Sequence, residues 1–190
     1  MLLENIDPAE LALDEHELKN RLSSGERVDY INDNRYLRLL EACSCTYIAE
    51  RLAITEREGE LFLGDIQAPG AAFRRVAKGC SECFVMVCTL GHGVDRLMAK
   101  EQHLSVTDAF AIDAMADALI ESLCDEAEKR ICKGLRTVPR FSPGYADLPL
   151  GVGQRIVNLL GADMRLGIRF TESGLMIPKK SVSAIVCVKD

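Results

Sequence analysis

The longest amphipathic stretch of the sequence covers residues 105–132 and predicts a helix. Ser105 and the acidic Asp108 offer an N-terminal cap. Apolar side chains follow at three- and four-residue spacing, which makes a wide stripe: Phe110, Ile112, Met115, Ala116, Leu119, Ile120, Leu123, Cys124, Ala127 and Ile131. A stripe of this width is typical of a helix that packs on a core, and we expect this helix to pack on a sheet.

A second row of side chains runs beside that stripe, each four residues from the next: Asp113, Asp117, Glu121 and Asp125. Like charges at this spacing destabilise a helix by about 0.2–0.5 kcal/mol per pair, so helix stability does not explain the row. One interpretation is a solvated face whose charges are screened by water and salt. The other is that one or more of these acids meets a cation.

The length of 190 residues and the apolar content of 48% predict a single domain, residues 1–190, with a full core. The formal charge of −6 argues against a nucleic-acid partner, because such a partner calls for a basic face. The sequence has no run of 18 apolar residues, so no membrane span is predicted. The segment 1–7 lacks the basic start of a signal peptide. We therefore expect a cytoplasmic protein.

Eight cysteines are present, and most lie inside apolar runs such as 84–88, so we expect buried free thiols. Cys80 and Cys83, with Cys88 nearby, invite a metal or redox interpretation. A structural zinc site needs four ligands, however, and the sequence has no second Cys-x-x-Cys and no His-x-x-x-His. Three histidines without a serine or cysteine motif also make a nucleophilic triad unexpected. We predict no metal ligand and no catalytic residue.

The remaining periodicity predicts a mixed α+β fold. Apolar spacing indicates helices at 8–22, 35–54, 69–78 and 151–160. Apolar and β-branched runs indicate strands at 60–63, 82–89 and 181–188, and a strand pair that starts at 164–170. The expected architecture is one twisted, mostly antiparallel sheet flanked by helices.

A loop rich in proline and glycine follows the long helix. Three of the six prolines fall between Pro139 and Pro149. Pro143-Gly144 suits a type II turn, because proline presets φ at the second position and glycine accepts a positive φ at the third. Arg140 supplies a rigid donor fork suited to carboxylates, and Tyr145 supplies an aromatic face with a polar tip. An ordinary surface loop explains the same residues, so residue chemistry alone leaves both interpretations open.

The segment Arg140-Phe141-Ser142-Pro143-Gly144-Tyr145 resembles the Arg-x-x-Pro-Gly-Tyr signature of the activation domain of cobalamin-dependent methionine synthase. Residues 166–173 and 176–183 resemble that family's Gly-x-x-Leu-Thr-Glu-Ser and Met-x-Pro-x-x-Ser-Val-Ser segments. Residues 114–121 resemble the helix that precedes the signature. The resemblance covers residues 110–188, is weak over 1–109, and is closer to short free-standing relatives that lack the cobalamin and substrate modules.

The resemblance implies a curved domain that binds S-adenosylmethionine on its concave side. Arg140 and Tyr145 would fix the polar ends of the ligand, and backbone groups of Ser142 and Gly144 would contact it. Glu121 would supply the negative partner. By this likeness an Arg140→Ala variant is expected to lose ligand affinity while its thermal stability stays near that of the wild type.

The resemblance also implies a role in reductive methylation of cobalamin that is presented by a partner and not bound by this chain alone. The partner would be a corrinoid-binding protein or methyltransferase, with a possible electron-donor protein. The family carries an acid and a histidine just past the signature, where this chain has Leu150 and Gly151. An alternative is therefore a non-catalytic module that senses S-adenosylmethionine or docks on a corrinoid protein.

Overall fold

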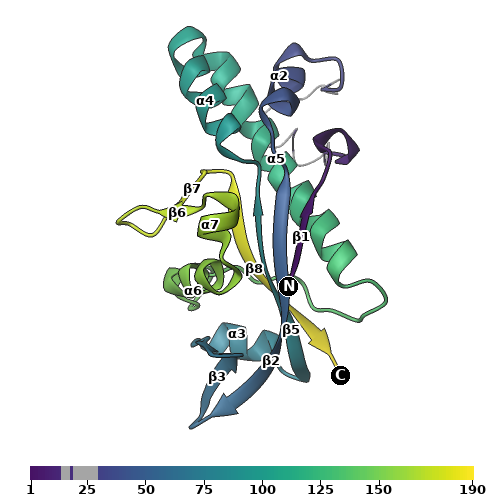
Figure 1. Cartoon of the computed structure of the whole chain (residues 1–190), viewed down its shortest axis with the longest axis vertical. Coiled ribbons are helices and arrows are strands. Elements are labelled where there is room, and N and C mark those ends of the chain that lie inside the picture. The colour runs from purple at the N-terminus through teal and green to yellow at the C-terminus, as the bar shows by residue number, and fades with distance from the viewer. Residues whose placement is uncertain (14–17, 19–29) are drawn as a thin grey trace.

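The computed structural model describes residues 1–13, 18 and 30–190, and a single antiparallel sheet runs through their centre (Figure 1). Its strands follow the order β4-β3-β2-β5-β8, and β1 pairs with the start of β2. The three long strands are β2 (Thr46–Arg57), β5 (Cys80–Thr89) and β8 (Ser181–Lys189). The short ones are β1 (Leu2–Asn5), β3 (Glu60–Leu63) and β4 (Ile66–Gln67).

Helices cover both faces of this sheet. On one face lie the helices α2 (Asn34–Ala42), α4 (His92–Leu104) and α5 (Val106–Ile131), together with the 3-10 helix η1 (Pro8–Glu10). On the other lie α3 (Ala71–Val76), α6 (Leu150–Leu160) and α7 (Ala162–Leu166). A small hairpin of β6 (Arg169–Phe170) and β7 (Met176–Ile177) projects beside α7 (Figure 1).

The two layers follow from side-chain alternation along the central strands. On β5, Met86 and Cys88 face α5, whereas Val85 and Val87 face α6, and all four are fully buried. A strand buried on both faces reads as a continuous apolar run, which is why residues 82–89 could be predicted as a central strand. The predicted α+β fold with a mostly antiparallel sheet flanked by helices is confirmed.

Several other predicted elements are present. Strand 60–63, the helices within 69–78 and 105–132, the helix at 151–160 and the strand at 181–188 are all found, with shifts of a few residues at their ends. Ser105 caps α5 through a hydrogen bond from the Asp108 N–H to its Oγ, at 3.2 Å. No helix in the described part of the chain is long and apolar enough to cross a membrane.

The predicted helix at 35–54 is wrong beyond residue 42. The chain leaves α2 at Cys43 and continues as β2 from Thr46. The apolar residues that fit helical spacing also fit a period of two, because burial alternates from Glu50 to Ile54 along β2. Tyr47 and Ile48, an aromatic and a β-branched residue that both favour strands, are fully buried there.

Three smaller expectations also change. Of the predicted helix at 8–22 the structure shows η1, and residues 14–17 and 19–29 lie outside the described residues. Of the strand start expected at 164–170, residues 164–166 belong to α7, because Gly161 and Gly167 adopt left-handed φ values of 60° and 68° and bracket a short helix; the strand of the predicted pair is confined to Arg169–Phe170, which pairs with β7. Phe110 was expected in the core but is 59% exposed.

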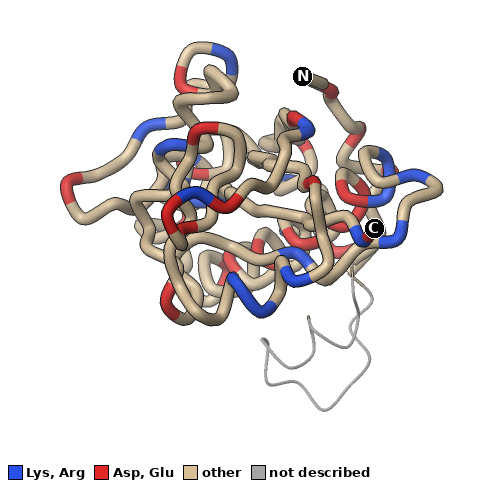
Figure 2. The backbone as a smooth tube through the Cα atoms, turned by 90° about the horizontal axis from the view of Figure 1, so that it is seen from below, with Lys and Arg blue, Asp and Glu red and all other residues tan. Residues whose placement is uncertain are grey.

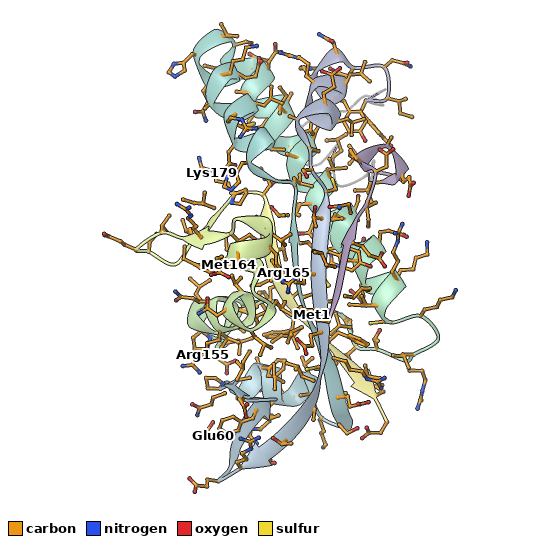
Figure 3. The ribbon with its side chains drawn as sticks, viewed as in Figure 1. Met1, Glu60, Arg155, Met164, Arg165 and Lys179 are labelled. Atoms are coloured by element: carbon orange, nitrogen blue, oxygen red, sulfur yellow. The ribbon has the colours of Figure 1, made fainter. Side chains whose placement is uncertain are left out.

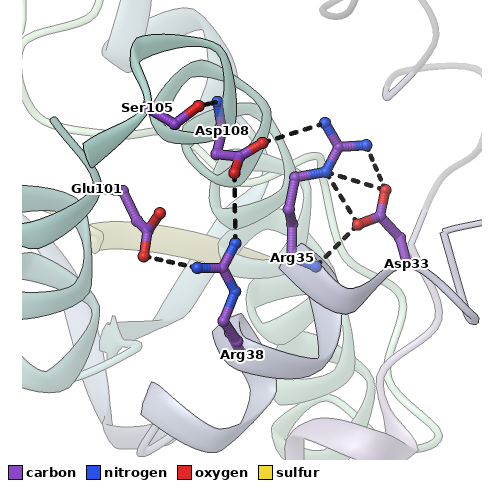
Figure 4. A network of polar contacts seen from close by, with 6 residues as sticks. All are labelled: Asp33, Arg35, Arg38, Glu101, Ser105 and Asp108. Atoms are coloured by element: carbon purple, nitrogen blue, oxygen red, sulfur yellow. Dashed lines mark hydrogen bonds and ion pairs between the residues drawn. The ribbon is translucent and has the colours of Figure 1, made fainter.

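An ion-pair network joins the three helices on the α5 face (Figure 4). Arg38 on α2 donates to Glu101 on α4 at 2.6 Å, and the Glu101 side chain is only 2% exposed. Arg38 and Arg35 also lie 3.7 and 3.8 Å from Asp108 in the first turn of α5, where a carboxylate complements the helix dipole. The network therefore fixes α2 and α4 against the start of α5.

Replacement of Arg38 by alanine should destabilise the fold, because the buried Glu101 carboxylate loses its cation. We expect the free energy of unfolding in urea to fall by about 1–3 kcal/mol. Lys129→Ala, which removes an exposed pair with Glu126, serves as control and should change it by less than about 0.5 kcal/mol. Equal effects of the two variants would contradict a structural role for the network.

Candidate functional site

The loop that carries Arg140 begins as an added edge on the sheet. Residues 136–141 run along β8 through backbone hydrogen bonds, including those from Val138 N–H to Cys187 O at 3.1 Å and from Phe141 N–H to Ile185 O at 2.8 Å. Neighbouring side chains on an extended segment point to opposite faces. The side chain of Arg140 therefore lies against α5, while Phe141 is buried under α3 and α6.

The guanidinium of Arg140 lies among three carboxylates of α5. It donates to Glu121 at 2.6 Å and to Asp125, and Glu128 lies 3.5 Å away. The Arg140 side chain is 22% exposed. Burial opposes its charge, but the hydrogen bonds that it donates to Asp125 and Glu121 outweigh this and raise the pKa of Arg140 above its usual value. The side chain is thus held charged and oriented before any ligand arrives.

The first half of the acidic row is paired as well. Lys180, at the start of β8, lies 2.7 Å from Asp113 and also contacts Asp117, and its side chain is only 11% exposed. All four acids of the row therefore meet cations of the same chain, while the side chains of Asp113 and Asp125 remain 48% and 70% exposed. Elsewhere, acidic and basic positions are interspersed along the backbone, as Figure 2 shows.

The predicted turn at Pro143-Gly144 is present. The Tyr145 N–H donates to the Ser142 carbonyl at 3.1 Å, and Gly144 has a φ of 91°, as the third position of a type II turn requires. A Cβ at Gly144 would lie 2.5 Å from the end of the Leu150 side chain, which would have to shift, so the positive φ is the main reason for glycine here. The Tyr145 ring is 69% exposed and meets Phe141 edge-on, with ring centroids 5.5 Å apart.

Asp147 fastens this loop to α3. Its carboxylate accepts hydrogen bonds from the backbone N–H of Ala71 at 2.6 Å and of Ala72 at 3.1 Å, so it caps a helix more than seventy residues earlier. These bonds lower the pKa of Asp147. Gly70 permits the contact, because a Cβ there would lie 2.7 Å from Asp147 Oδ1.

A surface hollow of about 770 Å³ opens beside Arg140. Its lining includes Asp125, Glu128, Lys129, Lys133, Thr137 and Arg140. Asp125 and Glu128 of α5 lie close to the Arg140 guanidinium. Lys129, near the end of α5, and Lys133, in the turn that follows, complete the charged lining. Its size is within the range of small-molecule sites, which is about 300–1,000 Å³.

The structure brings together some of the predicted site residues. Arg140 and Glu121 are in direct contact, and Arg140 lines the hollow. Ser142, Gly144 and Tyr145 lie on the turn that follows and are not among the residues lining the hollow. Glu121 is also absent from that lining, and the assignment of all five residues to a ligand stays a prediction.

Sequence reasoning missed two residues that shape the site, Glu128 and Asp147. Glu128 follows Asp125 by three residues and therefore continues the acidic row on the same helical face, a signal that was available in the sequence. Asp147 carried no such signal, because its partners are backbone groups of α3 and only the fold brings them near.

The cysteines are distributed over the hydrophobic clusters on both faces of the sheet. All eight are free, and seven are buried, as predicted, whereas Cys43 is partly exposed. Cys88 and Cys124 share a hydrogen bond in the core near Arg140 and Glu121, and this contact together with burial raises the pKa of Cys88. Among residues 1–13, 18 and 30–190, no group of three or more His, Cys, Asp or Glu side chains is arranged to hold a metal ion.

Comparison with known proteins identifies the fold. No protein-family model matches the chain, and no curated protein matches it. Among solved structures, the chain is similar to the crystal structure of the MetH reactivation domain bound to AdoHcy, with a TM-score of 0.73 and 15% sequence identity. The match covers 98% of this chain and 77% of that one, so the described chain has the fold of the MetH reactivation domain.

The contacts of Arg140 revise the expectation that Arg140→Ala leaves stability near that of the wild type. Loss of the guanidinium leaves three carboxylates together on α5, and we expect the free energy of unfolding to fall by about 1–3 kcal/mol at low salt. Urea titrations at low and high salt measure the effect. Part of the loss should be recovered in high salt, or by adding Asp125→Asn, because both reduce the repulsion. No recovery in either case would show that the charges are not its cause.

Asp147→Asn should loosen the contact between the loop and α3, visible as faster amide hydrogen exchange at Ala71 and Ala72. Because the folded pKa lies below the ordinary value of 3.8, the charged carboxylate stabilises the fold at all pH values above 3.8. That contribution is lost as the pH falls through the lowered pKa. The difference in melting temperature between wild type and variant should thus be constant from pH 5 to 7 and shrink below about pH 3.8. Asp65→Asn, at a 97% exposed side chain, is the control.

Proposed function

We propose that this chain binds S-adenosylmethionine and supports the reductive methylation of a corrinoid cofactor held by a separate protein. The observation that carries the proposal is the meeting of Arg140 with the acids of α5 beside a ligand-sized hollow, in a chain with the fold of the MetH reactivation domain. The relative was crystallised with AdoHcy, the product that S-adenosylmethionine leaves after methyl transfer.

The charges suit this ligand. Three carboxylates surround one guanidinium, so the cluster of Glu121, Asp125, Glu128 and Arg140 carries two net negative charges. S-adenosylmethionine offers a sulfonium and an ammonium group, which such a cluster attracts. In the proposed complex, the carboxylate of S-adenosylmethionine pairs with Lys129 and Lys133, which line the same hollow. In the proposed complex, Tyr145 and backbone groups of Ser142 and Gly144 contact the ligand along the turn that leaves the hollow.

The proposed chemistry takes place on the partner's cofactor. One electron from a reductant converts cob(II)alamin to cob(I)alamin, whose cobalt attacks the sulfonium methyl group. The carbon–sulfur bond breaks, the cobalt–carbon bond forms, and neutral S-adenosylhomocysteine is released. This chain contributes position rather than a reacting group, because holding the methyl carbon in line with the cobalt removes most of the entropic barrier. The proposed setting is the cytoplasm, with a corrinoid-binding protein or methyltransferase and an electron donor as partners.

Isothermal titration tests the binding. S-adenosylmethionine should bind the wild type, and Glu121→Gln should weaken it by up to about fivefold, the value of a partly exposed charge pair. S-adenosylhomocysteine lacks the sulfonium charge but keeps the ammonium group, so Glu121→Gln should weaken its binding by a smaller factor. Glu60→Gln, at the far end of the molecule in Figure 3, is the matched control. Absence of binding to the wild type would refute the proposal.

Methyl transfer is tested separately. A corrinoid protein carrying cob(II)alamin is mixed with a chemical one-electron reductant, S-adenosylmethionine and this chain, and methylcobalamin is followed by visible absorbance. We expect its formation to require this chain. Binding without any methylation would instead support the alternative, a module that senses S-adenosylmethionine or docks on a corrinoid protein.

A further inference from the structure

A second hollow lies on the other face of the sheet, between α3 and the β2–β3 hairpin. Its volume is about 620 Å³, and its lining, drawn from residues 54–80, shares no residue with the hollow beside Arg140. The cavity exists because β2 extends beyond the point where its pairing with β5 ends. The last pair between β2 and β5 is Ala53–Glu82, whereas β2 continues for four more residues, 54–57, that pair only with β3.

The floor of this hollow is apolar. Ile54 and Leu61 come from the hairpin and Ala77 from the end of α3, and all three belong to the hydrophobic core on that face of the sheet. Leu61 and Ala77 are 8% and 5% exposed, so the residues of the floor are packed against the hydrophobic core. An apolar floor of this kind favours a ligand with an apolar body.

The rim is basic. Arg74, Arg75 and Lys78 line the hollow, and Glu56 is the one acid among its lining residues. Glu56 is already paired with Arg74 at 3.0 Å. The side chains of Arg75 and Lys78 make no hydrogen bond or ion pair with any residue that the structure describes, although the charge of Arg75 helps to lower the pKa of Asp147. Two cations are thus left at the rim, in a chain whose overall charge is −6.

We propose that this second hollow binds an amphipathic organic anion: a carboxylate, sulfonate or phosphate attached to an aromatic or aliphatic body. The apolar part rests on Ile54, Leu61 and Ala77, and the anionic group meets Arg75 and Lys78. The second hollow shares no lining residue with the hollow beside Arg140, and none of its residues falls in the segment that resembles the methionine synthase family.

The test uses 8-anilinonaphthalene-1-sulfonate, which combines an aromatic body with one negative charge. Its binding to the ¹⁵N-labelled full chain is followed by NMR, with S-adenosylmethionine absent, so that failure here says nothing about the first site. We expect the largest shifts at the amides of Ile54, Ala77 and Lys78. Arg75→Ser/Lys78→Ser should weaken binding about three- to tenfold, as expected for two partly exposed charge contacts.

Two controls make the test decisive. Lys129→Ser/Lys133→Ser removes the same charge from the other hollow and should leave the affinity unchanged. N-phenyl-1-naphthylamine has the same rings without the sulfonate and should bind the wild type several-fold more weakly. Unmoved amide signals of Ala71 and Ala72 in the Arg75/Lys78 variant verify that α3 is intact. Shifts centred elsewhere, equal losses in both double variants, or equal affinity for the neutral probe would each overturn the proposal.

Discussion

The burial of β5 and β8 on both faces is the constraint from which the rest of the molecule follows. A strand covered on two sides needs a helical layer above and below it, and the apolar stripes of α5 and α6 provide these layers. The segment 136–141 then adds to β8 and inherits its alternation. The side chain of Arg140 points toward α5 and that of Phe141 toward α6, so these two residues anchor the loop on opposite faces of the sheet.

This arrangement explains why a helix tolerates a row of acids along one side. The repulsion within the row is compensated by Arg140 and Lys180, which reach α5 from the loop and from β8. Both cations are largely buried, so their charges are less screened than those of surface pairs. The ion pairs thereby join α5 to β8 and to the segment 136–141 added beside it. The acids outnumber the cations there, so the excess negative charge lies where a cationic ligand could approach.

The sequence predicted most of the elements because their periods were unambiguous. Helix 105–132 has a wide stripe and a cap, and strand 181–188 alternates cleanly with β-branched residues. Residues 46–54 failed because their apolar positions satisfied both a helical period and a period of two, and only pairing with β5 decides between them. For the site, the acidic row and Arg140 were visible as unusual residue patterns. The contacts of Lys180 with Asp113 and Asp117 join segments far apart in the sequence, and the contact of Asp147 with α3 depends on backbone groups that no local pattern marks.

The short helix α3 has a mechanical consequence. The backbone N–H groups at its start donate hydrogen bonds to Asp147, which lies in the loop that carries Arg140. Its last turn lines the second hollow. α3 is six residues long, so one short helix connects the Asp147 contact with the wall of the second hollow. If a ligand in the second hollow displaces α3, it also changes the Asp147 contact and with it the loop that carries Arg140. Thermodynamic reciprocity then requires that a ligand of this loop change the affinity of the second hollow by the same factor.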